Sequence, residues 1–258
     1  MPTSAAIPAS VLYGFLLVLA RLVGVFTFLP LPGLKAGPDS AKIALSLALT
    51  LALYSRWPIL KSPPTSMVQL AGWMLAEAGI GLATGVAVAF ILEGMVMAAQ
   101  AISTQAGFSY ASFVDPNTEA DATVLILIAQ LTAGLLFFAM GLDRQLLAIL
   151  SKSLETNPPG TFAAGRPGVE ALVMLGSSVF STGIRLVLPL MTLLFLIDLS
   201  MGLLGRLNSQ LQLIALALPA KMLAAMLALS LLVLMAPKLY QQSAAAAFRV
   251  LTKLLGID

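Results

Sequence analysis

The longest charge-poor stretch of the chain limits the folds that it can adopt. This stretch runs from Met67 to Gln105, and its 39 residues include only two charged side chains, Glu77 and Glu93. As a single α-helix, at 1.5 Å per residue, it would be roughly 58 Å long, almost twice the thickness of the hydrocarbon core of a bilayer. The sequence therefore predicts either a helical hairpin bent near Glu93 and Gly94 or one helix that projects well beyond a membrane.

The rest of the chain is also unusually apolar. Hydrophobic residues make up 59% of the 258 residues and charged residues only 10%, whereas an average globular protein is roughly one quarter charged. A chain with so little polar surface cannot cover a water-facing fold of its size. We therefore expect an all-α integral membrane protein built from helical hairpins, with further apolar segments at residues 11–34, 43–54, 123–142, 171–204 and 211–235.

Composition excludes several kinds of chemistry. The chain has no histidine and no cysteine, so thiolate and imidazole catalysis, structural zinc, iron–sulfur clusters and His-ligated haem are excluded. No phosphate-binding loop of the GxxxxGK[ST] type is present. The net charge of +3 comes from scattered basic residues, which gives no nucleic-acid-binding patch. The sequence predicts no enzyme, no catalytic residue, no metal site and no cofactor.

Several charged residues lie inside the apolar segments, where an unpaired charge costs roughly 2.5–3.5 kcal/mol in lipid. We expect four of them to be paired inside a helical bundle or with a partner subunit: Arg21, Glu77, Arg185 and Asp198. For Arg21 and for Glu93, the alternative is a position at the membrane interface, from which a long side chain reaches water. The sequence does not predict which charges pair with each other.

Small residues follow Glu77 at every fourth position. Gly81, Gly85 and Ala89 would lie on one face of a helix, and small residues at this spacing allow two membrane helices to approach closely. We interpret them as a packing feature.

A polar and aromatic segment, Gly107 to Pro116, separates the long apolar stretch from the next one. A helix should end there, because a proline disfavours helical geometry in the residue before it, Asp115. A break between two membrane-length segments also needs protein or water around its free amide groups. The simplest interpretation is a capped turn between helices, with its aromatic side chains packed on the bundle.

The loops do not follow the charge pattern of a simple serpentine membrane protein. Lys35 and Lys42 lie in one loop and Arg56 and Lys61 in the next, so neighbouring loops are both basic. One explanation is that several apolar segments cross no lipid and are buried by other subunits.

Three blocks of sequence together resemble the FliR family of flagellar export-gate subunits and its injectisome counterparts. The first block is Arg21 to Leu53, and the second joins Glu77–Gly85 to the segment Gly107–Pro116 (GFSYASFVDP). The third block runs from Leu188 to Pro219. Their order and spacing match across nearly the whole chain, and the middle block is the most distinctive.

The resemblance implies a subunit of the type III export gate in the bacterial inner membrane, at the flagellar basal body. It implies a single domain over residues 1–258, packed into a multi-subunit channel for unfolded export substrates. Within this domain, the spacing of Lys238, Arg249 and Lys253 along small and apolar residues predicts that residues 238–258 form an amphipathic tail. The implied partners are FliP-like, FliQ-like and FlhB-like subunits and membrane lipid. It also implies that the broken segment helps to close the pore, through Gly107, Phe108, Ser109, Tyr110, Phe113, Val114, Asp115 and Pro116.

The chain departs from the family pattern at three places. Asn208-Ser209 stands where the family commonly has Ala-Pro, Ala217-Leu218 stands where it has Gly-Phe, and Asp143 replaces a frequent histidine. An injectisome export subunit therefore remains an alternative to a flagellar one. A small-solute secondary transporter, which should show paired broken helices in internal repeats, and a non-transporting assembly scaffold are the alternatives from other functional classes.

Overall fold

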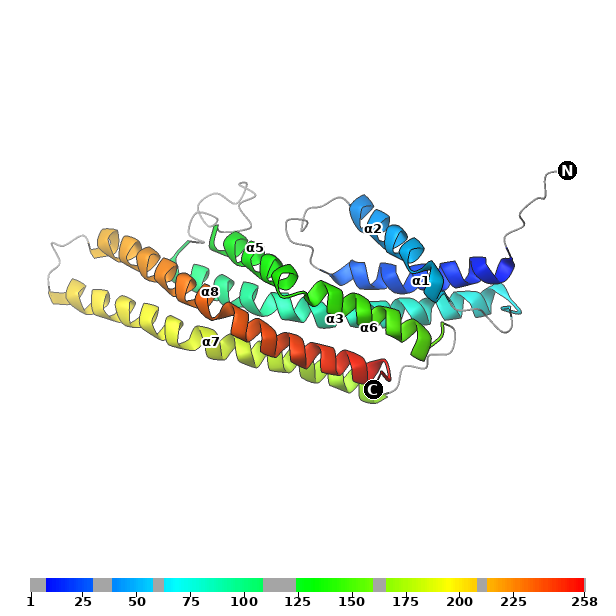
Figure 1. Cartoon of the computed structure of the whole chain (residues 1–258). Helices are drawn as coiled ribbons and strands as arrows, with labels where there is room; N and C mark the ends of the chain where they lie inside the picture. The colour runs from blue at the N-terminus through cyan, green and yellow to red at the C-terminus, as the bar shows by residue number, and fades with distance from the viewer. Residues whose placement is uncertain are drawn as a thin grey trace. The chain divides into compact units, whose positions relative to one another are not determined.

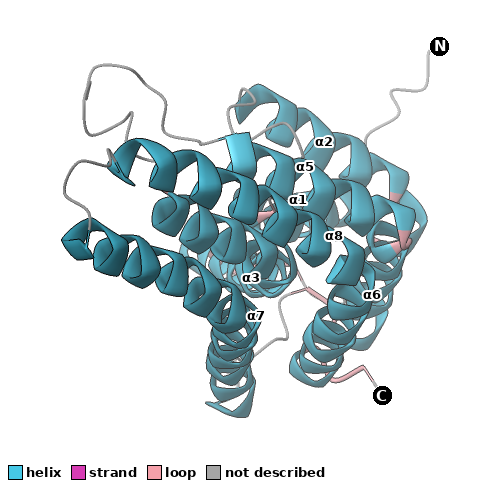
Figure 2. Ribbon diagram, turned by 90° about the vertical axis from the view of Figure 1, so that its left-hand side faces the viewer, coloured by secondary structure: helices cyan, strands magenta, loops and turns pink. Residues whose placement is uncertain are grey.

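The computed structural model describes residues 8–29, 39–57, 63–108, 124–159, 166–207 and 213–257, and all regular elements in these ranges are helices (Figures 1 and 2). This confirms the predicted all-α fold. The helices are α1 (Ala9–Phe28), α2 (Asp39–Ala52), a 3-10 turn (Tyr54–Arg56), α3 (Met67–Ala106), α5 (Val124–Ala139), α6 (Leu142–Thr156), α7 (Arg166–Leu207) and α8 (Leu213–Leu254).

Four of these helices contain segments long and apolar enough to cross a membrane: α1, α3, the Val187–Arg206 part of α7 and the Pro219–Leu254 part of α8. The bent pair α5 and α6 passes the same test as a fifth candidate when the two are taken together. Helix α2 has only 14 residues, which is less than a full crossing needs. The described helices therefore support the prediction of an integral membrane protein.

The long apolar stretch forms one uninterrupted helix. Helix α3 has 40 residues and continues through Glu93 and Gly94, so the alternative of a hairpin bent at these residues is wrong and the single helix is confirmed. It ends at Gly107, whose φ of 86° is left-handed and therefore suits glycine. The amide of Gly107 donates to the carbonyl of Thr104, and that of Phe108 to the carbonyl of Ser103, which is the hydrogen-bond pattern of a Schellman C-cap.

A second glycine turn separates α5 from α6. The two helices meet at an angle of 61°, and Gly141 between them has a φ of 66°. Helix α6 is amphipathic, with a buried stripe of Leu142, Leu146, Leu150 and Leu154.

Helices α7 and α8 have 42 residues each and are drawn in Figure 1 in yellow and in orange to red. Both contain internal prolines, Pro189 in α7 and Pro219 and Pro237 in α8. Each such proline removes one helical hydrogen bond. The residues predicted to form an amphipathic tail, from Lys238 onward, are the last part of α8.

The chain folds as two compact units. The first contains residues 1–90, 138–176 and 244–258, and the second contains residues 91–137 and 177–243. Helices α3, α5, α7 and α8 contribute to both.

In the first unit, α1 and α3 pack with almost no side chain between their backbones. A Cβ atom added to Gly24 of α1 would lie 2.5 Å from the carbonyl oxygen of Ala78. One added to Gly81 of α3 would lie 2.9 Å from the Cα of Gly24. A Cβ atom added to Gly85 would lie 3.3 Å from the Cα of Val25. The predicted close approach at Gly81 and Gly85 is confirmed, with α1 as the partner helix.

We predict that Gly81→Ala destabilises the folded protein, because the new methyl group would overlap backbone atoms that cannot move independently. Overpacking of this kind costs typically about 1–3 kcal/mol, which thermal unfolding of the purified protein in detergent would detect. The matched control is Gly79→Ala on the same helix, where nothing lies within 4 Å of an added Cβ. The control should be neutral or slightly stabilising, because alanine favours helix. Equal stability of the two variants would contradict the close packing.

Candidate functional site

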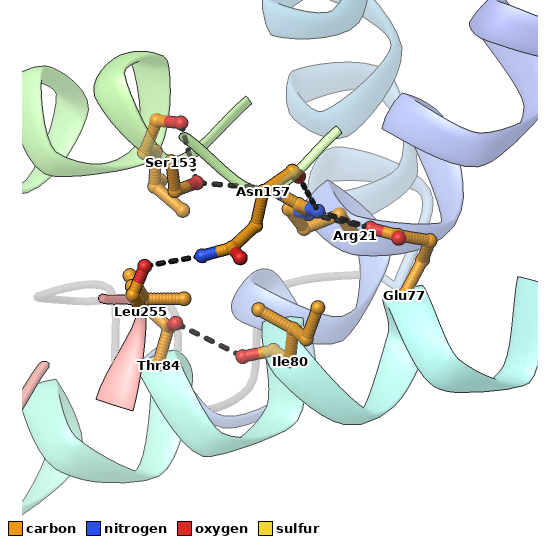
Figure 3. A network of polar contacts seen from close by, with 8 residues as sticks. Arg21, Glu77, Ile80, Thr84, Ser153, Asn157 and Leu255 are labelled. Atoms are coloured by element: carbon orange, nitrogen blue, oxygen red, sulfur yellow. Dashed lines mark hydrogen bonds and ion pairs between the residues drawn. The ribbon is translucent and has the colours of Figure 1, made fainter. Parts of the chain in front are cut away.

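A buried ion pair joins α1 to α3 (Figure 3). Arg21 lies in the middle of α1 and is 1% exposed, and Glu77 of α3 is fully buried. The Nε and Nη2 atoms of Arg21 both lie 2.6 Å from Oε2 of Glu77. Arg21 is therefore inside the protein, and the alternative of an interfacial side chain that reaches water is wrong.

The other donors of Arg21 bind the end of α6. Its Nη1 donates to the hydroxyl of Ser153 at 2.9 Å, and its Nη2 donates to the backbone carbonyl of Asn157 at 3.1 Å. The Ser153 hydroxyl donates in turn to the carbonyl of Leu150 at 2.7 Å. One guanidinium thus fixes three segments of the chain, which a lysine could not do because its single ammonium group lacks the planar fork.

The network continues to the last residues of the chain. The side-chain amide of Asn157 donates to the backbone carbonyl of Leu255, as Figure 3 shows. Leu255 and Ile257 are buried together with Ile80 of α3, and Ile149 of α6 packs against them. The segment after α8 is therefore held by an apolar cluster and by a hydrogen bond that depends on the position of Asn157.

A second ion pair lies in the second unit, between α7 and α8. Nζ of Lys221 lies 2.7 Å from Oδ1 of Asp198, and the side-chain amide of Gln105, at the end of α3, lies 3.4 Å from Oδ2. Asp198 is 40% exposed and Lys221 13%. Since both charges lie within candidate membrane spans, the pair reduces the cost of placing each of them there.

The structure places the predicted charges in two separate pairs. Arg21 and Glu77 bind each other, whereas Asp198 binds Lys221. Arg185 lies on α7, and its side chain is outside the described part of the structure. The sequence did not predict Lys221 as a member of the site, although it too is a charge in an apolar run. Sequence reasoning missed Ser153, Asn157 and Gln105, because nothing in their local sequence distinguishes them from other polar residues near a helix end.

The predicted pore loop begins directly after α3. Gly107 and Phe108 form its described start, and both are half-buried. The other predicted loop residues lie outside the described residues: Ser109, Tyr110, Phe113, Val114, Asp115 and Pro116. The described geometry thus shows where the helix ends and that Gly107 supplies the left-handed turn there.

The apolar helices differ in how far the chain itself covers them. In the most apolar window of α3, 56% of the residues are buried, and in α1 44%. The share falls to 11% for the Val187–Arg206 part of α7. The side chains that α7 leaves exposed there are large and hydrophobic: Leu188, Leu193, Phe195, Leu196, Leu199, Leu203 and Leu204.

No group of three or more acidic residues that could hold a metal ion occurs among the described residues. The site consists of ion pairs, hydrogen bonds and apolar surfaces.

Comparison with known proteins identifies the family. Residues 12–247 match the family described as bacterial export proteins, family 1. The chain belongs to this family. The flagellar biosynthetic protein FliR of Escherichia coli K12 is 30% identical over 202 residues, which are 78% of this chain and 77% of that protein. FliR of Caulobacter vibrioides is 29% identical over 225 residues, 84% and 86% of the two chains.

An injectisome protein is also similar. The surface presentation of antigens protein SpaR of Salmonella typhimurium is 25% identical over 217 residues, covering 83% of this chain and 78% of that protein. The resemblance to the FliR family and its injectisome counterparts is therefore confirmed. The chain is a FliR-family protein of type III export.

We predict that Arg21→Gln strongly destabilises this FliR-family protein. The change leaves Glu77 in an apolar interior without its guanidinium partner, and breaking a buried pair by removing one partner costs about 3–5 kcal/mol. The unfolding temperature in detergent and the amount of protein in membranes should both fall.

The matched control is Arg56→Gln. Arg56 pairs with Glu155 in the same unit, but their side chains are 47% and 53% exposed, and exposed pairs contribute about 0–1 kcal/mol. If Arg21→Gln changed stability no more than Arg56→Gln, the buried network would not hold the unit together.

Proposed function

We propose that this protein forms part of the protein-conducting channel of the flagellar type III export gate, together with FliP-like and FliQ-like subunits and in contact with an FlhB-like one. Its place is the bacterial inner membrane at the flagellar basal body. The FliR names of its relatives support the flagellar assignment, and the apolar helices support the membrane location. The proposed role is conduction of unfolded protein substrates, and it requires no catalytic step from this chain.

The uncovered face of α7 is the observation that carries the proposal. A helix with 11% of its apolar window buried and a row of large hydrophobic side chains must be covered by lipid or by protein. Helix α7 is 42 residues long, about 63 Å at 1.5 Å per residue, so a bilayer core of about 30 Å does not cover its full length. Partner subunits would cover the remainder, and this also accounts for neighbouring basic loops that fit no serpentine topology.

We further propose that residues 107–116 obstruct the channel. The proposed obstruction is an apolar constriction formed by Phe108, Tyr110, Phe113 and Val114. It would exclude water and ions by dewetting and would open for an unfolded chain. Gly107 would set the direction in which the loop leaves α3, since its left-handed turn ends that helix. Asp115 and Pro116 would fix the other end.

The predicted effect of deleting Gly107 to Val114 is an ion leak through the assembled complex, because the apolar barrier is removed while the helices remain. Membrane conductance, measured with the complex reconstituted in bilayers, should rise above that of the unmodified complex. The control is the double substitution Ser109→Ala and Ser112→Ala, which keeps the loop length and its aromatic residues and should not leak. Normal assembly with unchanged conductance after the deletion would contradict the obstruction.

A second prediction concerns the partners. Co-expression with FliP-like and FliQ-like chains from the same bacterium should yield one complex that co-purifies. Leu196→Glu and Leu199→Glu on the uncovered face of α7 should reduce this assembly, since a charge placed in an apolar interface is costly. Arg206→Glu, at the end of the same helix, is the control and should assemble. Wild-type co-purification for the Leu variants would place this face against lipid and not against a subunit.

The alternatives make different predictions. A small-solute transporter should be active as a purified lone chain, and it has no support from the comparisons. An injectisome subunit is favoured only by the similarity to SpaR. Restoration of motility in a strain that lacks its own FliR would support the flagellar role.

A further inference from the structure

The second unit contains a small pocket between α3, α7 and α8 that is large enough to hold a water molecule. Its volume is about 30 Å³, above the roughly 10–15 Å³ that a cavity needs to hold a water. Most of its lining is apolar, from Ile91, Met95 and Ala98 of α3 and Leu232, Ala236 and Leu239 of α8. Such a pocket would be dry if nothing polar faced it.

Two glycines provide the space for the pocket. Gly94 of α3 and Gly183 of α7 both line it, and a Cβ added to Gly183 would lie 3.8 Å from the carbonyl oxygen of Gly94. That distance is ordinary van der Waals contact, so a side chain would fit there without a clash. The space is therefore available at this position and is not closed by tight backbone packing, unlike the contact at Gly81.

The polar groups of the pocket come mainly from α8. Tyr240 and Ser243, three residues apart and hence on one helix face, both line it. Tyr240 is 3% exposed, and its hydroxyl has no hydrogen-bond partner among the described protein atoms.

Pro237 lies between these lining residues on α8 and interrupts the helical hydrogen bonds. It has no N–H group, so the carbonyl of Val233, four residues earlier, lacks its usual donor. Waters commonly satisfy backbone groups that a proline frees within a membrane helix. A buried water needs two to four polar partners, and two of the side chains that line the pocket, Tyr240 and Ser243, carry hydroxyl groups.

We propose that this pocket is a binding site for one structural water, held by the Tyr240 hydroxyl beside the Pro237 break in α8. The water satisfies a phenol hydroxyl that would otherwise be buried at a cost. The proposal is independent of the channel role, because it concerns how these three helices pack within one unit.

The sign of the stability change in Tyr240→Phe tests the proposal. If a water binds the hydroxyl, its removal leaves that water with one partner fewer, and the unfolding temperature of the full complex in detergent should fall by roughly 2–4 °C. If the pocket is dry, the substitution removes an unsatisfied polar group, and the unfolding temperature should stay the same or rise. Either of these last results would overturn the proposal.

The control is Tyr54→Phe, because Tyr54 is 63% exposed and packs against Trp57. This change should leave the unfolding temperature unaffected. A second measurement does not depend on a variant: an experimental structure of the complex at a resolution that shows solvent. Density for a water within 3.2 Å of Oη of Tyr240, roughly the hydrogen-bond limit, would support the site, and a pocket free of density would refute it.

Discussion

The packing of the first unit depends on one guanidinium group in an apolar interior. An arginine side chain carries five N–H donors and no acceptor, so the donors of Arg21 must be satisfied where it lies. They are satisfied by a carboxylate on α3, a hydroxyl on α6 and a backbone carbonyl just after α6. These partners lie 56 to 136 positions away in the sequence. A shift of any of the segments along its axis would leave a buried charge or donor unpaired, which restricts them to one register.

The glycine contacts act on the same helix pair. Gly24 lies three residues after Arg21 and Gly81 four residues after Glu77, so the closest backbone approach lies about one helical turn from the ion pair. Close approach lets the Arg21 and Glu77 side chains meet without spanning a gap, and the ion pair fixes the register in which the glycines face each other. In the second unit, by contrast, much of the apolar surface of α7 is uncovered by the chain, which is why we assign that surface to partners.

The sequence predicted the helices well and the contacts poorly. Charge-poor length alone indicated membrane helices, and the spacing of Gly81 and Gly85 indicated close packing, because both features follow from local periodicity. Whether α3 bends at Gly94 could not be decided locally, since glycine is compatible with either a break or a continuous helix and tertiary packing decides. The helices α7 and α8 proved longer than their apolar cores indicated, because polar ends such as Arg166 and Lys253 extend them beyond the hydrophobic signal.

The pairing of charges could not be predicted for a different reason. The only sequence signal is a charge in an apolar run, and it is the same for Arg21, Glu77, Asp198 and Lys221. Only the fold decides which of these charges form pairs. Ser153 and Asn157 carry no signal at all. The segment 107–116 was conspicuous in sequence, yet its proposed role rests on the resemblance to the FliR family and on the helix end at Gly107.

The central claim is that this chain contributes to the wall of a protein-conducting channel and that the loop after α3 lies in its lumen. The most direct test is a photo-cross-linking residue placed at Tyr110 in cells that carry an export substrate stalled in transit. The account predicts a cross-link to the substrate that appears only when the substrate is stalled, and none from the same probe placed at Tyr54. Cross-links from Tyr110 to lipid alone, in complexes that assemble and export normally, would contradict it.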